Sequence, residues 1–212
     1  MQALRGFKEI LHLEAQKLSK LISLSEAKAK LYQFEPAYFP VLESKDTFVR
    51  SLGSSSDIIG KEIYHFSDRN QLEVALRPEF TAIIARTIVS NKEYQKLPLK
   101  FFSYGPLFRY ERPQKGRKRQ FHQLNFEHFG ADQTSDEAEL LTLIWQIINQ
   151  LKLTDKITLK INSLGNREER LNYRQALVDY LTPKAQQLSA DSQASLSQNP
   201  LRILDSKEPN DQ

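Results

Sequence analysis

The sequence predicts an α+β fold in which hairpins of antiparallel strands are flanked by helices. Segments with apolar residues at helical spacing stand at the beginning, middle and end of the chain rather than after every strand. The strand-like segments between them come in pairs joined by short polar stretches, which is typical of hairpins. Because strands and helices do not alternate one by one, the pattern argues against a doubly wound parallel sheet.

The first fifty residues contain two expected helices and one expected strand. Residues 7–31 carry apolar side chains near one helical face, which predicts a long helix. Pro36 and Pro40 prevent this helix from continuing. Residues 38–42 are interpreted as a strand that tolerates proline at an edge or a junction. Ser44 is then a favourable N-cap for a short helix.

A hairpin and a helix are expected next. Two short segments, 63–66 and 72–76, flank the polar residues 67–70, which form a good turn sequence. Pro78 stands at a favourable first position for a helix over 79–90. The later expected elements are strands at 99–104, 106–112, 120–130 and 157–161 and helices at 136–151 and 166–181.

Composition limits the function classes. The 212 residues are enough to bury a core without disulfides. Cysteine is absent, which excludes a thiolate zinc site and a cysteine nucleophile and is consistent with a reducing cytoplasm. The chain has 30 Lys and Arg against 26 Asp and Glu, a net charge of only +4. Positive charge can therefore point to a function only where basic residues are concentrated. The N-terminus does not resemble a signal peptide, and no stretch approaches the roughly 18 consecutive apolar residues of a membrane span. We therefore expect a soluble cytoplasmic protein with no membrane partner and no protein-bound metal.

The most informative segment is 108–130, FRYERPQKGRKRQFHQLNFEHFG. Strand alternation places Arg109 and Glu111 on one face, and a loop with four basic residues follows them. A guanidinium binds phosphate oxygens through paired hydrogen bonds, an aromatic ring stacks on a purine, and a carboxylate holds an ammonium group. The set therefore suits a nucleotide and a small zwitterion, although spacing alone fits a solvated hairpin with a charged tip equally well. The residues expected to share a face on the returning strand are Phe121, Gln123, Asn125 and Glu127.

Residues 108–123 resemble motif 2 of class II aminoacyl-tRNA synthetases, in the form FR-x-ERPQ-x-GR-x-RQFHQ that is typical of histidyl-tRNA synthetases. Other segments resemble further landmarks of that family in the same order, and the similarity covers essentially the whole chain. The resemblance implies a class II antiparallel sheet flanked by helices. The other matching segments are 51–64, 76–82, 161–165 and 199–205.

The resemblance also implies residue roles for ATP. Arg109 would bind the α-phosphate and the acyl group under attack, and it is the expected catalytic residue. Glu111 and Arg117 would hold the nucleotide, and Phe121 would stack on adenine. ATP would be accompanied by Mg²⁺.

For the amino acid, the resemblance implies a histidine pocket around Arg109. Gln123 and Glu127 would contact histidine, with Glu127 near its amino group. Glu79 and Thr81 would complete the pocket from the start of their helix. The implied reaction is ATP-dependent activation of L-histidine to histidyl-adenylate, followed by transfer to tRNA(His).

Three features qualify this resemblance. Phe80 stands where the family often has Gly, so the close backbone approach expected there is open to question. Motif 3 and the anticodon-binding domain are not found in residues 1–212, so the chain is expected to be a partial class II catalytic core with motifs 1 and 2, inactive or weakly active by itself. Pro40 would correspond to motif 1 and a homodimer interface, with an ordinary strand-edge proline as the alternative.

Two other functions fit parts of the sequence. A non-catalytic histidine-binding relative, similar to the regulatory subunit of ATP phosphoribosyltransferase, would keep the fold. The intact ATP residues Arg109, Glu111, Arg117 and Phe121 argue against it, because a histidine sensor needs no ATP site. A general RNA-binding module would use the basic residues 115–119. That short run favours contact with the end of a tRNA over a free-standing RNA binder.

Overall fold

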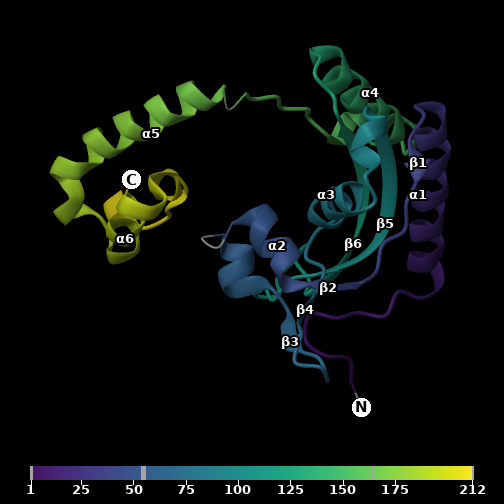
Figure 1. The fold of residues 1–212 in the computed structure, drawn as a ribbon, viewed down its shortest axis with the longest axis horizontal. Helices are drawn as coiled ribbons and strands as arrows, with labels where there is room; N and C mark the ends of the chain where they lie inside the picture. The colour runs from purple at the N-terminus through teal and green to yellow at the C-terminus, as the bar shows by residue number, and fades with distance from the viewer. Residues whose placement is uncertain (1, 54–55, 164, 212) are drawn as a thin grey trace. The chain divides into compact units, whose positions relative to one another are not determined.

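The computed structural model describes residues 2–53, 56–163 and 165–211. The chain divides into two compact units, residues 1–157 and 158–212. All the strands of the described residues lie in the first unit. They form two small sheets, and helices pack against these sheets (Figure 1). The first unit also contains every residue expected to bind ATP or histidine.

The larger sheet has the strand order β1–β5–β6. β5 (Leu99–Phe108) and β6 (Gln120–Phe129) are antiparallel and pair over their whole length, which confirms the central hairpin. β1 (Glu35–Pro36) lies parallel to β5, so the sheet is mixed rather than wholly antiparallel. A strand of two residues carries too little hydrophobic pattern to be recognised in a sequence.

Helices cover both faces of this sheet (Figure 1). α1 (His12–Leu31) and α4 (Thr134–Gln150) lie on one face, where Phe102 and Leu143 are buried together. α3 (Thr81–Ser90) lies on the other face. Alternation along β5 and β6 therefore separates a core face, beneath α1 and α4, from a face directed at α3. The buried residues of the α3 side are Phe80, Ile84, Ile88 and Leu107.

The smaller sheet is antiparallel with the order β2–β4–β3. β3 (His65–Ser67) and β4 (Glu73–Leu76) form the second expected hairpin. β2 (Leu42–Ser44) pairs with the other edge of β4. α2 (Lys45–Leu52) follows β2 directly, as expected from Ser44, although the Ser44 side chain makes no capping hydrogen bond.

The long helix begins at His12 rather than at Phe7. Gly6 adopts a φ of +88°, and its carbonyl accepts the backbone N–H of Arg119 at 2.9 Å. The ring of Phe7 packs edge-on against Tyr64, with 6.3 Å between centroids. The residues before the helix are therefore held against the central hairpin, a long-range contact that outweighs their helical pattern.

The strand expected over 38–42 is a second correction, because these described residues form no continuous strand. The carbonyls of Phe39 and Pro40 accept hydrogen bonds from the guanidinium of Arg77. The carbonyl of Val41 accepts the backbone N–H of the same arginine at 2.9 Å. Carbonyl groups that a strand would pair with a neighbouring strand are here satisfied by the side chain and the backbone N–H of Arg77.

Two further boundaries differ from expectation. The segments 99–104 and 106–112 form the single strand β5, which continues through Gly105 and ends at Phe108. The helix expected from residue 79 begins at Thr81. The short helical turns of the chain are Ile58–Glu62, Glu93–Lys96, Thr154–Lys156, Thr182–Gln187, Pro200–Asp205 and Pro209–Asp211.

The second unit is helical. α5 (Arg167–Leu181) confirms the expected helix, and the Asn166 side chain caps it by accepting the backbone N–H of Glu169 at 2.9 Å. α6 (Ala190–Gln198) follows. The strand expected over 157–161 is wrong, since these described residues pair with no other strand and their apolar side chains are exposed. A small core holds the unit together, built from Leu181, Leu188 and Ile203.

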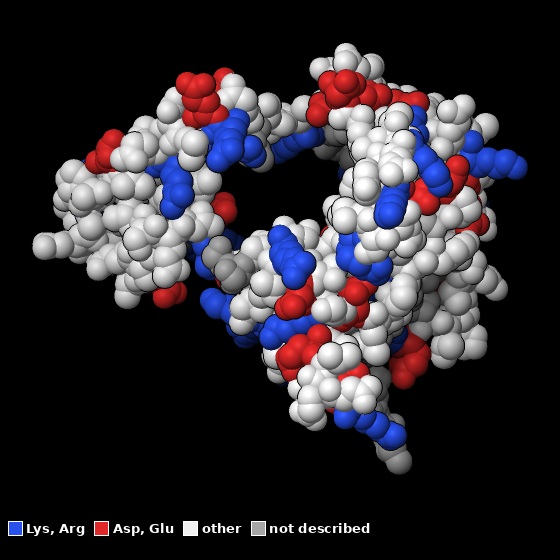
Figure 2. All heavy atoms as spheres, viewed as in Figure 1, with Lys and Arg blue, Asp and Glu red and all other residues white. Residues whose placement is uncertain are grey.

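Charge is dispersed on the visible face of the molecule. Figure 2 shows Lys and Arg interspersed with Asp and Glu there, in keeping with the net charge of +4. Within the described part of the chain, no helix combines the length and apolar character needed to cross a bilayer.

Candidate functional site

Arg109 stands immediately after β5, where the hairpin opens. Its backbone N–H donates to the carbonyl of Arg119 at 2.9 Å, which extends the strand pairing by one residue. Its Nε donates to the carbonyl of Pro78 at 3.0 Å, and its guanidinium carbon lies 5.4 Å from the ring centroid of Phe121. Because Nε fixes the guanidinium, the two Nη groups form the edge that can bind an anion in bidentate fashion.

The loop after Arg109 is closed by an ion pair between Glu111 and Arg117. The Nη1 of Arg117 donates to Oε2 of Glu111 at 3.0 Å. The Glu111 side chain is 16% exposed and the Arg117 side chain 64% exposed, so the arginine lies on the solvent side of the pair. β5 ends before Glu111, so the loop, rather than strand alternation, places this carboxylate. The two expected nucleotide residues are therefore brought into direct contact.

A second carboxylate, Glu62, lies beside this loop. Its backbone carbonyl accepts the N–H of Tyr110 at 2.7 Å. Burial raises the pKa of the Glu62 carboxyl above its usual value, and the negative charge of Glu111 raises it further, while Arg109 acts in the opposite direction. Sequence reasoning did not single out Glu62, because an acidic residue before a short strand carries no distinctive pattern.

The opposite end of the hairpin face meets the first turn of α3. The hydroxyl of Thr81 donates to the carboxylate of Glu127 on β6. Nδ2 of Asn125 donates to the same carboxylate oxygen at 3.3 Å. Gln123 lies between this point and the loop end, opposite Gly105 in the strand register. Thr81, Gln123 and Glu127, all expected at the histidine pocket, thus border one face of the hairpin.

Glu79 and Phe80 form the entry to α3. Oε1 of Glu79 accepts the backbone N–H of Ala82 at 2.8 Å, so this carboxylate caps the helix from outside its first turn. Phe80 is 1% exposed and packs with Ile84 and Leu107 between α3 and β5. The ring in place of the Gly expected from the resemblance is therefore buried in the core between α3 and β5.

The arrangement has two functional ends on one strand. Phe121 and Glu127 share a face of β6 and are six residues apart, which corresponds to about 20 Å at roughly 3.4 Å per residue. A cation and an aromatic ring occupy one end, and a hydrogen-bonded carboxylate occupies the other. Such a surface can bind a nucleotide and an ammonium-bearing molecule in line.

Comparison with known proteins shows the family of the chain. The family model described as histidyl-tRNA synthetase matches residues 6–186. The chain belongs to the histidyl-tRNA synthetase family. The match includes the whole hairpin, the start of α3 and the segment around Pro40.

Close relatives of the chain are histidine–tRNA ligases. The chain is 47% identical over 212 residues to that of Orientia tsutsugamushi (strain Boryong), covering 100% of the chain and 50% of the relative. It is 49% identical over 212 residues to that of Rickettsia canadensis (strain McKiel), covering 51% of the relative. The chain therefore spans about half the length of the curated relatives it matches.

Solved structures confirm the class II fold. Apo histidyl-tRNA synthetase of S. aureus aligns with a TM-score of 0.77 and 29% identity, over 99% of this chain and 49% of that chain. An ATP phosphoribosyltransferase regulatory subunit/histidyl-tRNA synthetase from Bacillus halodurans aligns with a TM-score of 0.61 and 18% identity, over 96% of this chain and 55% of that chain, which supports the fold alone. Three residues of the segments that resemble family landmarks, Ser54, Ser55 and Leu164, lie outside the described residues.

Proposed function

We propose that the chain carries the histidine-activating site of a histidine–tRNA ligase. The observation that carries this proposal is the shared face of β6, with Arg109 over Phe121 at one end and Thr81 bonded to Glu127 at the other. ATP and L-histidine are the substrates that fit these ends. Family membership supports the same assignment, with tRNA(His) as the acceptor of the activated amino acid.

The ATP end is organised around a cation that is already held in place. The carbonyl of Pro78 fixes Nε of Arg109, so its Nη groups need no reorientation to bind the α-phosphate. Phe121, half-buried beneath Arg109, supplies the ring on which adenine stacks. Arg117 is the more exposed partner of its ion pair and can leave Glu111 to contact the nucleotide.

The histidine end is organised around a carboxylate. Glu127 accepts hydrogen bonds from Thr81 and Asn125, which fix its orientation toward the ammonium group of the substrate. The substrate carboxylate then attacks the α-phosphorus of ATP, an oxygen–phosphorus bond forms, and pyrophosphate leaves with the electrons of the broken bond. A carboxylate is already ionised near neutral pH and needs no general base. Arg109 stabilises the charge that develops on the α-phosphoryl group.

Mg²⁺ fits this site as a companion of the nucleotide. Among the described residues, no group of three or more His, Cys, Asp or Glu could hold a metal by itself. Mg²⁺ commonly binds through one or two carboxylates together with substrate phosphates and water. Glu111 in the loop after Arg109, and Glu62, whose carbonyl accepts the N–H of Tyr110 in the same loop, are the residues that would hold it. Bound there, the ion would neutralise phosphate charge.

We propose a tRNA-facing role for the loop between β5 and β6. Lys115 and Lys118 are exposed near Arg117, so three cations reach solvent close to the ATP end. Such side chains suit the phosphates of an acceptor strand. Their proximity to Arg109 would bring the end of tRNA(His) to the activated histidine.

Self-association through the segment around Pro40 is also proposed. Pro40 is exposed, and its neighbours Tyr38 and Leu42 are 72% and 46% exposed. Apolar side chains gathered on one segment favour burial against a second copy. Sedimentation of Tyr38→Glu should show a weaker dimer than that of the unmodified chain. Tyr94→Glu is a matched control, since Tyr94 is 48% exposed on a different segment.

Calorimetric titration tests the function directly. The chain should bind ATP saturably, and histidine should bind more tightly when ATP or a non-hydrolysable analogue is present. Histidine-dependent exchange of pyrophosphate into ATP would demonstrate the chemistry. Failure to bind ATP would contradict the proposal, and binding of histidine alone would favour the regulatory-subunit function instead.

A further inference from the structure

A buried arginine, Arg77, links the ATP end of the site to the segment around Pro40. Its residue exposure is 3%, and burial lowers the pKa of its guanidinium below the usual value. Its described hydrogen-bond partners are carbonyl groups: Nε donates to Pro106 at 2.9 Å, and Nη1 donates to Phe39 at 2.6 Å and to Pro40 at 3.3 Å. A buried cation is costly unless its donors are satisfied, so these bonds hold three backbone segments in one arrangement.

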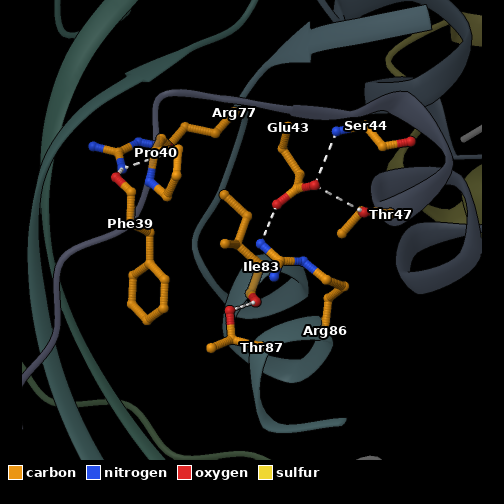
Figure 3. Close-up of polar contacts among 9 residues, drawn as sticks. All are labelled: Phe39, Pro40, Glu43, Ser44, Thr47, Arg77, Ile83, Arg86 and Thr87. Atoms are coloured by element: carbon orange, nitrogen blue, oxygen red, sulfur yellow. Dashed lines mark hydrogen bonds and ion pairs between the residues drawn. The ribbon is translucent and has the colours of Figure 1, made fainter. Parts of the chain in front are cut away.

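The surrounding fold leaves space for this guanidinium. Its central carbon lies 4.5 Å from the ring centroid of Phe80. A Cβ at position 105 would stand 2.6 Å from Nη2, and only glycine avoids that contact. Figure 3 shows the Arg77 side chain extending to Phe39 and Pro40 from the residue that follows β4.

The backbone of the same residue reaches the catalytic end of the hairpin. The carbonyl of Arg77 accepts the N–H of Phe108 at 3.0 Å, directly before Arg109. The next carbonyl along the chain, that of Pro78, accepts Nε of Arg109 at 3.0 Å. Any shift of residues 77–78 would therefore move the acceptor that orients the Arg109 guanidinium.

We propose that Arg77 is a positioning residue that sets the orientation of Arg109. It locks residues 77–80 between the Phe39–Pro40 segment and β5, so the acceptor at Pro78 stands at a fixed place. Arg77 acts through Arg109 and does not itself touch substrate. The consequence for ATP rests on the proposed function, whereas the effect on the Arg109 side chain does not.

Arg86 provides a matched control. It lies on α3 and pairs with Glu43 on β2, so it joins two neighbouring elements of the same unit (Figure 3). Its side chain is 38% exposed, and no hydrogen bond described for it reaches the segment that orients Arg109. Arg86→Lys therefore makes the same residue exchange at an arginine that bridges two elements, without touching the Pro78 acceptor.

The first experiment observes Arg109 without any ligand. In the ¹⁵N-labelled chain, the Nε–H signals of Arg77 and Arg109 should both be protected from exchange, with assignments made by Arg77→Lys and Arg109→Lys. In Arg77→Lys, the Arg109 signal should shift and lose at least tenfold in protection. In Arg86→Lys it should remain unchanged. An Arg109 signal that is unprotected in the unmodified chain, or unaltered in Arg77→Lys, would overturn the proposal.

A second variant keeps the guanidinium and displaces it. Gly105→Ala crowds Nη2 of Arg77, so it should change the Arg109 signal in the same way. This variant replaces Arg77→Lys in the test if Arg77→Lys does not fold. ATP titration then measures the consequence at the site. Small misplacements of a binding group cost about 100-fold at the extreme, so Arg77→Lys should bind ATP 10- to 100-fold more weakly, and Arg86→Lys within about twofold of the unmodified chain. Equal losses in both variants would show a merely structural role. An unmodified chain that binds no ATP contradicts the function but leaves the NMR result decisive for Arg77.

Discussion

Thr81 and Glu127 meet across the site although they are 46 residues apart, with the threonine hydroxyl donating to the glutamate carboxylate. The contact joins the first turn of α3 to β6. Asn125 donates to the same oxygen, so the carboxylate is oriented before any ligand is bound. An anionic group held in this way is prepared to receive a cation.

Glu127→Gln is expected to weaken histidine binding selectively. The amide keeps the shape of the side chain but removes the charge that we propose faces the substrate ammonium. Loss of a hydrogen bond to a charged group costs about 1.5–3 kcal/mol, which corresponds to roughly 10- to 100-fold in affinity. Titration calorimetry should show that loss for histidine and less than a twofold change for ATP.

Lys118→Ala serves as the control for Glu127→Gln, because Lys118 is exposed on the loop. It should leave both affinities near those of the unmodified chain. An unchanged histidine affinity in Glu127→Gln together with loss of activation in Lys118→Ala would show that the faces of the hairpin are wrongly assigned.

Arg109→Lys should not preserve activation. Lysine keeps the charge but loses both the Nε bond to Pro78 and the planar pair of Nη donors. Removal of one preorganised donor commonly costs about 2.7–4 kcal/mol, or roughly 100- to 1,000-fold in rate. In a version extended to the full length of the relatives, pyrophosphate exchange should fall by that range in Arg109→Lys, and it should be nearly unchanged in Arg112→Lys, which alters an exposed arginine of the same loop.

Phe80→Gly, which introduces the residue frequent in the family, should destabilise this chain. The ring is 1% exposed among Ile84 and Leu107, and removal of a buried aromatic side chain costs about 3–5 kcal/mol. Urea unfolding should show this loss. Phe66→Ala, at a residue 48% exposed on β3, should cost less than about 1 kcal/mol. Equal midpoints for Phe80→Gly and the unmodified chain would mean that the ring is not part of the core.

Glu62→Gln should stabilise the chain at neutral pH. The pKa of Glu62 is raised in the folded state, so the folded chain binds the carboxyl proton more tightly than the unfolded chain does. The associated stability is present below the unfolded pKa and is lost as the pH rises through the folded pKa. At pH 7 the free energy of unfolding of the variant should therefore exceed that of the parent by less than about 1 kcal/mol, which thermal unfolding would detect. The difference should vanish near pH 4.

Exposed Glu9→Gln is the comparison for Glu62→Gln. As a surface substitution, it should change the stability by less than about 0.5 kcal/mol. A Glu62→Gln variant that is less stable than the parent at pH 7 would mean that the attraction to Arg109 and Arg117 outweighs burial.

Local pattern predicted the parts of this fold that depend on local forces. The β5–β6 hairpin and α5 lie where alternation, helical spacing and the Asn166 cap place them. β1 and the start of α1 depend on contacts with residues far along the chain, and no short-range pattern encodes them. The strand expected over 38–42 is absent for the same reason, because the Arg77 guanidinium donates hydrogen bonds to the carbonyls of Phe39 and Pro40.

The site shows the same division. Gln123 and Glu127 were placed on one face by the period of a strand, and they lie there. Glu111 lies beyond the strand and is placed by its ion pair with Arg117, which alternation could not predict. The positioning contacts of Arg77 also escaped prediction, since a single arginine before a proline has no pattern that signals burial.

The bond between the Gly6 carbonyl and the Arg119 N–H has a consequence for the order in which the chain is completed during synthesis. Gly6 leaves the ribosome 113 residues before Arg119, roughly 6–23 s earlier at about 5–20 residues per second. Through that interval the Gly6 carbonyl lacks the N–H of Arg119. The bond can form only after Arg119 has emerged, so the residues before α1 reach their final place later than α1 itself can form.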